Sequence, residues 1–120
     1  MFVNYTNHHS GNWNKKQLDE AQKYGEIIDM AFPQVNPNCC EKELLSIAQT
    51  EAGKIIDLHP DCVLCQGEMT LCFAIVDILL KNGVDVVSAC SQRNTVEQKV
   101  GDTIKKIVEF DFVRFRKFIS

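Results

Sequence analysis

The stretch that decides the fold runs from Asp61 to Arg93 and reads DCVLCQGEMTLCFAIVDILLKNGVDVVSACSQR. Its first part is a short apolar run, CVLC, followed by the polar residues Gln66-Gly67-Glu68. A longer apolar segment then continues to a stop signal at Asn82-Gly83. A second apolar run leads into Ser91-Gln92-Arg93. The pattern predicts a strand–helix–strand unit with polar residues where each strand ends.

Length and composition fit one domain, residues 1–120, with a core of its own. Hydrophobic residues make up 45% of the chain and charged residues 24%, which is typical of globular proteins. No run approaches the roughly 20 apolar residues of a membrane span, and no secretory signal is visible, so we expect a cytoplasmic protein with no membrane partner. The net charge of −3 argues against binding of long nucleic acids, which requires many phosphate contacts. A small anionic ligand held by a few local cations remains compatible with this charge.

Strand and helix patterns alternate along most of the chain, which predicts a parallel sheet with right-handed crossovers. We therefore expect an α/β fold: a small, three-layer, Rossmann-like domain with a mainly parallel sheet of about four strands and a C-terminal antiparallel hairpin. The expected strands are Phe2–Thr6, Glu26–Phe32, Cys62–Cys65 and Val84–Ala89. Three helices are expected. The first starts near Asn12 or Asn14, and Gln17 would complete a capping box with Asn14. The second starts at Cys39 with Asn38 as its cap, and the third starts after Gly67. The expected hairpin pairs residues 95–100 with 104–118 through a turn at Gly101-Asp102, with a bulge near Val113.

Six cysteines invite a metal or redox interpretation, above all the Cys62-Val-Leu-Cys65 spacing. Positions three apart on one strand point to opposite faces of a sheet, so these two thiols should not converge on one ion. Buried apolar cysteines are the simpler interpretation. A structural zinc site that adds His59, or Cys39 and Cys40, is the alternative.

In open parallel sheets, ligands bind at the carboxyl ends of the strands. The polar strand ends here are residues 7–10, 66–68 and 91–93, together with Phe32-Pro33. The amides of Gln66 and Gly67 at a helix start would suit an anion, but they also fit a plain helix start with Glu68 as a helix N-terminal acid. No dinucleotide or P-loop motif is present.

The side chains near these strand ends each fit two interpretations. His8 and His9 suit a general acid or base near neutral pH, or exposed loop positions. Ser10 suits a phosphate contact or a helix entry. Arg93 suits a phosphate or base contact, or a surface salt bridge. If the protein is an enzyme, this sparse set fits cleavage without a metal, in which a ribose 2′-OH attacks its neighbouring phosphate and the protein orients the reactants and stabilises charge.

The residues also carry a family resemblance. Gln66-Gly67-Glu68, Gly83, Ser91-x-Arg93, Glu97, Lys106, Phe110 and the ending VRFRKF at residues 113–118 resemble the small CARF (CRISPR-associated Rossmann fold) proteins of type III CRISPR systems, some of which are ring nucleases. The opening Asn7-His8-x-Ser10, with Trp13 and Gln17, is similar to such proteins as well. His9 departs from the pattern, since the resemblance would place proline there.

The resemblance implies a homodimer that binds cyclic oligoadenylate above the strand ends. Ring nucleases of this group cut the messenger to linear products with a 2′,3′-cyclic phosphate, generally without a metal or other cofactor, and so turn off the antiviral response. The resemblance does not say whether Arg114 and Arg116 contact ligand. Carried over to this chain, it implies catalytic roles for His8, Ser10 and Arg93, and ligand binding by Asn7, Gln66, Gly67, Glu68, Ser91 and Gln92.

Two other functions stay open from the sequence. One is a CARF-like sensor or sponge that binds the same ligand without cutting it. The other is a generic Rossmann-like protein that binds another nucleotide.

Overall fold

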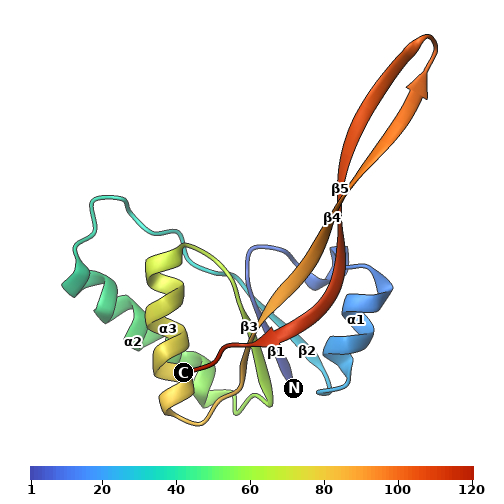
Figure 1. Ribbon diagram of the computed structural model, residues 1–120. Coiled ribbons are helices and arrows are strands. Elements are labelled where there is room, and N and C mark those ends of the chain that lie inside the picture. The colour runs from blue at the N-terminus through green and yellow to red at the C-terminus, as the bar shows by residue number, and fades with distance from the viewer.

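The computed structural model describes residues 1–120 and shows one mixed sheet with helices on both faces (Figure 1). The sheet order is β2-β1-β3-β4-β5; the first four strands are parallel, and β5 is antiparallel to β4. The α/β prediction with a parallel core and a C-terminal antiparallel hairpin is confirmed. The elements are β1 (Phe2–Tyr5), a 3₁₀ turn η1 (Ser10–Asn12), α1 (Lys15–Gln22), β2 (Ile27–Met30), α2 (Glu41–Asp57), β3 (Cys62–Cys65), α3 (Met69–Lys81), β4 (Val86–Val100) and β5 (Thr103–Lys117).

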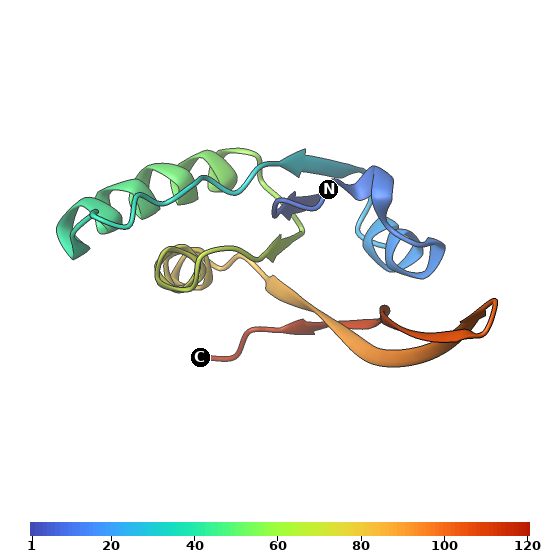
Figure 2. The same cartoon turned by 90° about the horizontal axis from the view of Figure 1, so that it is seen from above.

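Figure 2 shows α1 on one face of the sheet and α2 with α3 on the other. Each face has its own core. Phe2, Cys62 and Leu64 pack on the α1 side, whereas the alternate residues Val63 and Cys65 pack on the side of α2 and α3. The expectation that Cys62 and Cys65 point to opposite faces is therefore confirmed. None of the helices combines the length and apolar character that crossing a membrane requires.

Helix ends follow local capping chemistry, with one exception. The Asn14 side chain accepts a hydrogen bond from the Gln17 amide at 2.9 Å, as predicted for α1. The prediction of Asn38 as the cap of α2 is wrong. The Asn36 side chain accepts the Asn38 amide at 2.9 Å in a local turn, so α2 begins only at Glu41, after Cys40.

The largest correction concerns β4. The predicted strands at 84–89 and 95–100 are one continuous strand, Val86–Val100, because β5 pairs with it along its whole length. Ser91, Gln92 and Arg93 therefore lie within a strand and not at its end. The predicted bulge is confirmed: Cys90 pairs with Arg114 and Ser91 with Phe112, which leaves Val113 as the extra residue.

The outer part of this hairpin, residues 93–110, projects from the body as a two-stranded arm (Figure 1). Gly101 begins its turn with a φ of 63°, a conformation that favours glycine. The arm gives the chain a radius of gyration of 16.9 Å, whereas a compact domain of this length has about 13.6 Å.

Candidate functional site

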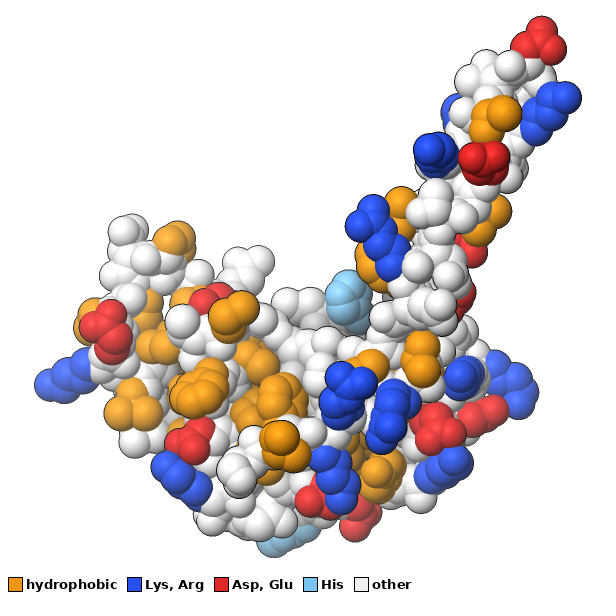
Figure 3. Space-filling model, in the orientation of Figure 1, with side chains coloured by type: hydrophobic (Ala, Val, Ile, Leu, Met, Phe, Trp, Pro, Cys, Tyr) orange, Lys and Arg blue, Asp and Glu red, His pale blue; other side chains and the backbone are white.

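A pocket of about 350 Å³ lies at the carboxyl ends of β1 and β3, beneath the base of the arm. We call it the strand-end pocket. Figure 3 shows the concave surface between the arm and the body, with a histidine side chain in it and basic side chains on the arm nearby. The pocket is lined by Thr6, His8, Trp13, Gln17, Leu64, Gln66, Ala89, Ser91 and Phe110.

Three of the predicted site residues meet in this pocket. His8 comes from the loop after β1, Gln66 follows β3, and Ser91 belongs to β4. These residues are far apart in the sequence. The parallel topology brings His8 and Gln66 together at strand ends, and Ser91 reaches the same pocket from within β4. An imidazole, an amide and a hydroxyl therefore line the same pocket.

Asp29 of β2 fixes the loop that carries His8. Its carboxylate accepts hydrogen bonds from the Ser10 amide at 2.9 Å, the Ser10 hydroxyl at 2.6 Å and the Asn4 side chain at 2.7 Å. Asn4 also donates to the His8 carbonyl at 2.8 Å. Burial raises the pKa of Asp29, but the hydrogen bonds from Ser10 and Asn4 outweigh it and hold that pKa below its usual value.

The same network accounts for Ser10 and His9. Ser10 is 8% exposed and its hydroxyl points at Asp29, which fits the helix-entry interpretation better than a phosphate contact. The His9 ring accepts the Gly11 amide through Nδ1 at 2.9 Å, and its Nε2 lies 3.3 Å from Asp29. His9 has a φ of −57°, a value that proline adopts as well.

Four of the predicted ligand contacts, Asn7, Gly67, Glu68 and Gln92, do not line the strand-end pocket. Asn7 lines a neighbouring depression with His9 and Asp29. Gln92 is one residue from Ser91 on β4, and adjacent residues of a strand face opposite sides. Gln92 therefore points away from the pocket.

Arg93 lies on the pocket side of the arm even though it is not at a strand end. Ala89 and Ser91 line the pocket, and alternation places Arg93 on the same face. It pairs across the ribbon with Phe110, which also lines the pocket. Its guanidinium is thus the nearest cation on β4 above the pocket.

Gly67 and Glu68 have structural explanations at the start of α3. A Cβ on Gly67 would lie 2.3 Å from the Phe32 ring, so the close approach that glycine permits is to an aromatic side chain. Glu68 accepts the amides of Thr70 at 3.1 Å and Leu71 at 2.8 Å. These hydrogen bonds, the one from Leu71 first, lower the pKa of Glu68. An anion at this helix start would have to displace the Glu68 carboxylate.

Trp13 and Phe110 were not predicted as site residues on chemical grounds, although the family resemblance includes both. Trp13 reaches the pocket from the turn before α1, and Phe110, 70% exposed, reaches it from β5. Aromatic faces of this kind stack on nucleobases, which contributes about 1–3 kcal/mol per base. A sequence signal existed at Phe110, since a large apolar residue next to the charged Glu109 and Asp111 suggests a contact surface.

A second, larger depression of about 530 Å³ lies between α3 and the C-terminal residues. We call it the α3 groove. Its walls include Met69, Phe73 and Ile119, which are 82%, 74% and 95% exposed. Figure 3 shows this apolar surface with basic side chains beside it. Arg114 and Arg116 pair with Cys90 and Ser88, so alternation places them on the side of the α3 groove, away from the strand-end pocket.

No group of three or more His, Cys, Asp or Glu side chains in the chain is arranged to hold a metal ion. In particular, His59, Cys39 and Cys40 do not join Cys62 or Cys65 in such a group.

A sequence model of the uncharacterized protein MJ1673 family matches residues 1–116. No curated protein and no solved structure matches the chain. Since the family model spans nearly the whole sequence, the chain belongs to the uncharacterized protein MJ1673 family.

Proposed function

We propose that this protein is a CARF-like, Rossmann-type homodimer that binds cyclic oligoadenylate at the strand-end pocket and cleaves it, down-regulating type III CRISPR signalling. The observation that carries the proposal is the composition of that pocket. His8, Gln66 and Ser91 meet there with the aromatic side chains of Trp13 and Phe110. Polar groups that reach base edges and ribose, combined with aromatic faces for stacking, are what a nucleotide requires.

The size of the pocket supports one nucleotide unit per chain. Its volume of about 350 Å³ is near the lower end of small-molecule sites, which span about 300–1,000 Å³. A ring of several nucleotides is much larger than one unit. Two pockets that face a shared space would hold such a ring, which is consistent with a dimer.

The surface area supports a second copy of the chain as the partner. The chain exposes 8133 Å², about 1,500 Å² more than the roughly 6,600 Å² expected for a compact monomer of its mass. A standard interface covers about 800 Å² per partner. The excess is larger than that area, and the projecting arm, whose residues are mostly exposed, accounts for part of it.

The exposed surface of α3 is the proposed contact. Met69 and Phe73 lie in its first turns, beside Gln66, which lines both the α3 groove and the strand-end pocket. A copy packed there would lie next to the pocket, and two-fold contacts are the commonest among homo-oligomers. Phe73→Glu should leave the fold intact, because this side chain is 74% exposed, and should give a monomer in sedimentation. A wild-type chain that sediments as a monomer would overturn this part.

The proposed cleavage uses the ligand's own nucleophile. A ribose 2′-OH attacks the adjacent phosphorus, the bond from phosphorus to the 5′ oxygen breaks, and a 2′,3′-cyclic phosphate and a 5′-OH form. The departing 5′ oxygen takes up a proton from water. His8 would accept the proton of the 2′-OH, and Arg93 would stabilise the negative charge on the phosphoryl oxygens. Neither role requires Ser10, whose hydroxyl is bonded to Asp29.

Binding without cleavage is the second candidate. With Ser10 held by Asp29, His8 is the one proton acceptor among the side chains that line the pocket. A single imidazole leaves the 5′ oxygen without a second group to protonate it, which favours a sensor or sponge.

One experiment separates the candidates. The purified protein is incubated with cyclic tetra-adenylate and cyclic hexa-adenylate in EDTA, and the products are resolved. Cleavage that His8→Ala abolishes while binding persists supports the nuclease. Binding without products identifies a sensor or sponge.

The role of Arg93 has a matched control on the same strand. Arg93→Ala should weaken binding at least tenfold, since a lost charge-assisted contact is worth about 1.5–3 kcal/mol. Lys99→Ala should leave binding unchanged, because Lys99 lies about 20 Å further along the strand at about 3.3 Å per residue. Equal affinities of the two variants would remove Arg93 from the site.

A further inference from the structure

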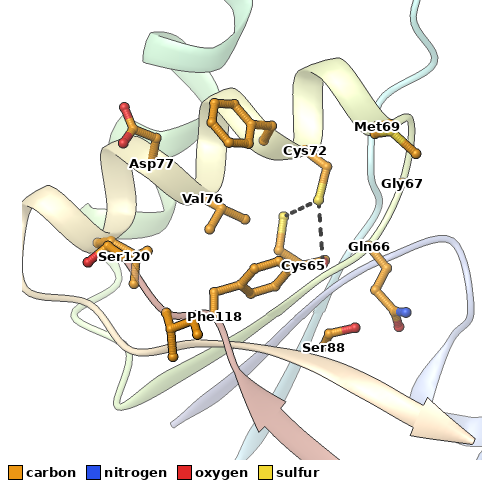
Figure 4. A pocket seen from close by; sticks show the side chains of 13 residues that line it. Cys65, Gln66, Gly67, Met69, Cys72, Val76, Asp77, Ser88, Phe118 and Ser120 are labelled. Carbon is orange, nitrogen blue, oxygen red and sulfur yellow. Dashed lines mark hydrogen bonds between the residues drawn. The ribbon is translucent and has the colours of Figure 1, made fainter.

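Two thiols meet where β3 ends and α3 begins. The Sγ atoms of Cys65 and Cys72 are 3.6 Å apart, and Cys72 Sγ also donates to the Cys65 carbonyl at 3.5 Å. Figure 4 shows both side chains directed at each other on the wall of the α3 groove. They are the one pair of thiols among the six free cysteines whose sulfur atoms contact each other.

The two thiols differ in access. Cys65 is 0% exposed, whereas Cys72 is partly exposed and lines the α3 groove between Gly67 and Phe73. A small reagent that enters this groove of about 530 Å³ therefore meets Cys72 first. Cys65 is placed behind it, within contact distance of the same sulfur.

The local electrostatics favour Cys72 as the nucleophile. The hydrogen bond from the Cys65 thiol lowers the pKa of Cys72, burial opposes this, and the Gly67 amide lowers the pKa further. The same hydrogen bond, followed by burial, raises the pKa of Cys65. An accessible thiolate next to a resolving thiol is the arrangement of oxidation-sensitive cysteines.

We propose that Cys65 and Cys72 form an oxidisable dithiol, which a low-molecular-weight disulfide of the glutathione type converts to a protein disulfide. The Cys72 thiolate attacks one sulfur of the reagent, whose S–S bond breaks and releases one thiolate, leaving a mixed disulfide on Cys72. Cys65 then attacks the Cys72 sulfur and expels the second thiolate. Two electrons pass from the protein to the reagent, and the two thiol protons end on the two released thiols.

The remaining cysteines do not offer this reaction. Cys62 lies in the core on the α1 side of the sheet, and burial raises its pKa to about 11. Cys39 donates to the Cys40 carbonyl, and Cys40 to the Glu43 carboxylate, so neither has a thiol partner. The sulfur of Cys90 lies 4.0 Å from the Ser88 carbonyl.

Oxidation would act on the strand-end pocket through Gln66. A disulfide draws the two sulfurs from 3.6 Å to about 2.05 Å, which pulls the Cys65 side chain at the end of β3 and the Cys72 side chain in the first turn of α3 toward each other. Gln66 is the next residue and lines both the α3 groove and the strand-end pocket. This consequence rests on the proposed function, whereas formation of the disulfide does not.

The test uses the full chain with Cys39, Cys40, Cys62 and Cys90 replaced by serine, titrated with glutathione disulfide. The expected product is lighter by two hydrogens and yields a linked peptide pair, Cys65 with Cys72. Adding Cys65→Ser should instead trap stable glutathione on Cys72, and adding Cys72→Ser should abolish reaction in the folded state.

Two results would overturn the dithiol. One is a stable mixed disulfide on Cys72 when Cys65 is present, and the other is no reaction of the folded chain under conditions that oxidise the unfolded chain. Unchanged nucleotide affinity after oxidation would remove only the coupling to the strand-end pocket. Absence of nucleotide binding in both redox states would concern the proposed function and leave the dithiol standing.

Discussion

Replacing Asp29 by alanine tests how the loop after β1 is held. The carboxylate joins three parts of the chain: β2, on which it lies, the Ser10 turn and the Asn4 side chain of β1. Asp29→Ala removes all three of these hydrogen bonds at once. The loop that carries His8 should then lose its fixed geometry.

The expected loss of stability follows from these contacts. A hydrogen bond to a charged group contributes about 1.5–3 kcal/mol, but the Asp29 side chain is 25% exposed, and water would replace part of the lost interactions. Asn4 keeps its second bond to the His8 carbonyl, whereas the Ser10 hydroxyl loses its partner at 8% exposure. The free energy of unfolding should fall by about 2–4 kcal/mol.

Urea unfolding at several pH values measures this loss, with Asp19→Ala as the control. Asp19 forms an exposed ion pair with Lys15, and such pairs contribute little. Because the pKa of Asp29 is lowered in the folded protein, its stabilisation is complete above the unfolded pKa near 3.8 and is lost as the pH falls through the lower folded value. The difference between wild type and variant should thus shrink in acid, as the pH falls below about 3.8. A loss under about 0.5 kcal/mol, the size of ordinary surface substitutions, would refute the network.

Two further predictions concern the start of α3. Gly67→Ala should lower the free energy of unfolding by about 1–3 kcal/mol, as overpacking does, because its Cβ would lie 2.3 Å from Phe32. Chemical denaturation measures this loss. In the control, Gly53→Ala should raise the free energy of unfolding, since nothing lies within 4 Å of that position and alanine favours a helix. Glu68→Gln should lower the melting temperature at neutral pH. The difference from wild type should vanish as the pH falls below the lowered pKa of Glu68. A difference that persists below this pKa would mean that the charge on Glu68 does not stabilise the amide of Leu71.

Local signals predicted much of the fold. Asn14 caps α1, CVLC forms β3, and Val113 is the bulge, because each depends on residues close in sequence. The length of β4 could not be predicted in this way. On an exposed two-stranded arm neither face lies against a core, so residues 95–100 alternate only weakly, and pairing with β5 decides where the strand ends.

Only part of the candidate site could be predicted, because some of its contacts join residues far apart in the sequence. The strand-end rule predicted that His8 and Gln66 lie close together, and Ser91 lines the same pocket from within β4. Asp29 was missed because its partners lie 19 and 25 residues away along the chain. Arg93 was predicted as a strand-end residue and lies within β4, since nothing local in the sequence shows that the strand continues past it.

The central claim is that the strand-end pocket binds cyclic oligoadenylate across a dimer. Calorimetric titration of the wild-type protein with cyclic tetra-adenylate and cyclic hexa-adenylate tests it most directly. The account predicts saturable binding of at least one of these rings at one ring per two chains. Absence of binding with both rings, or saturation at one ring per chain, would contradict it.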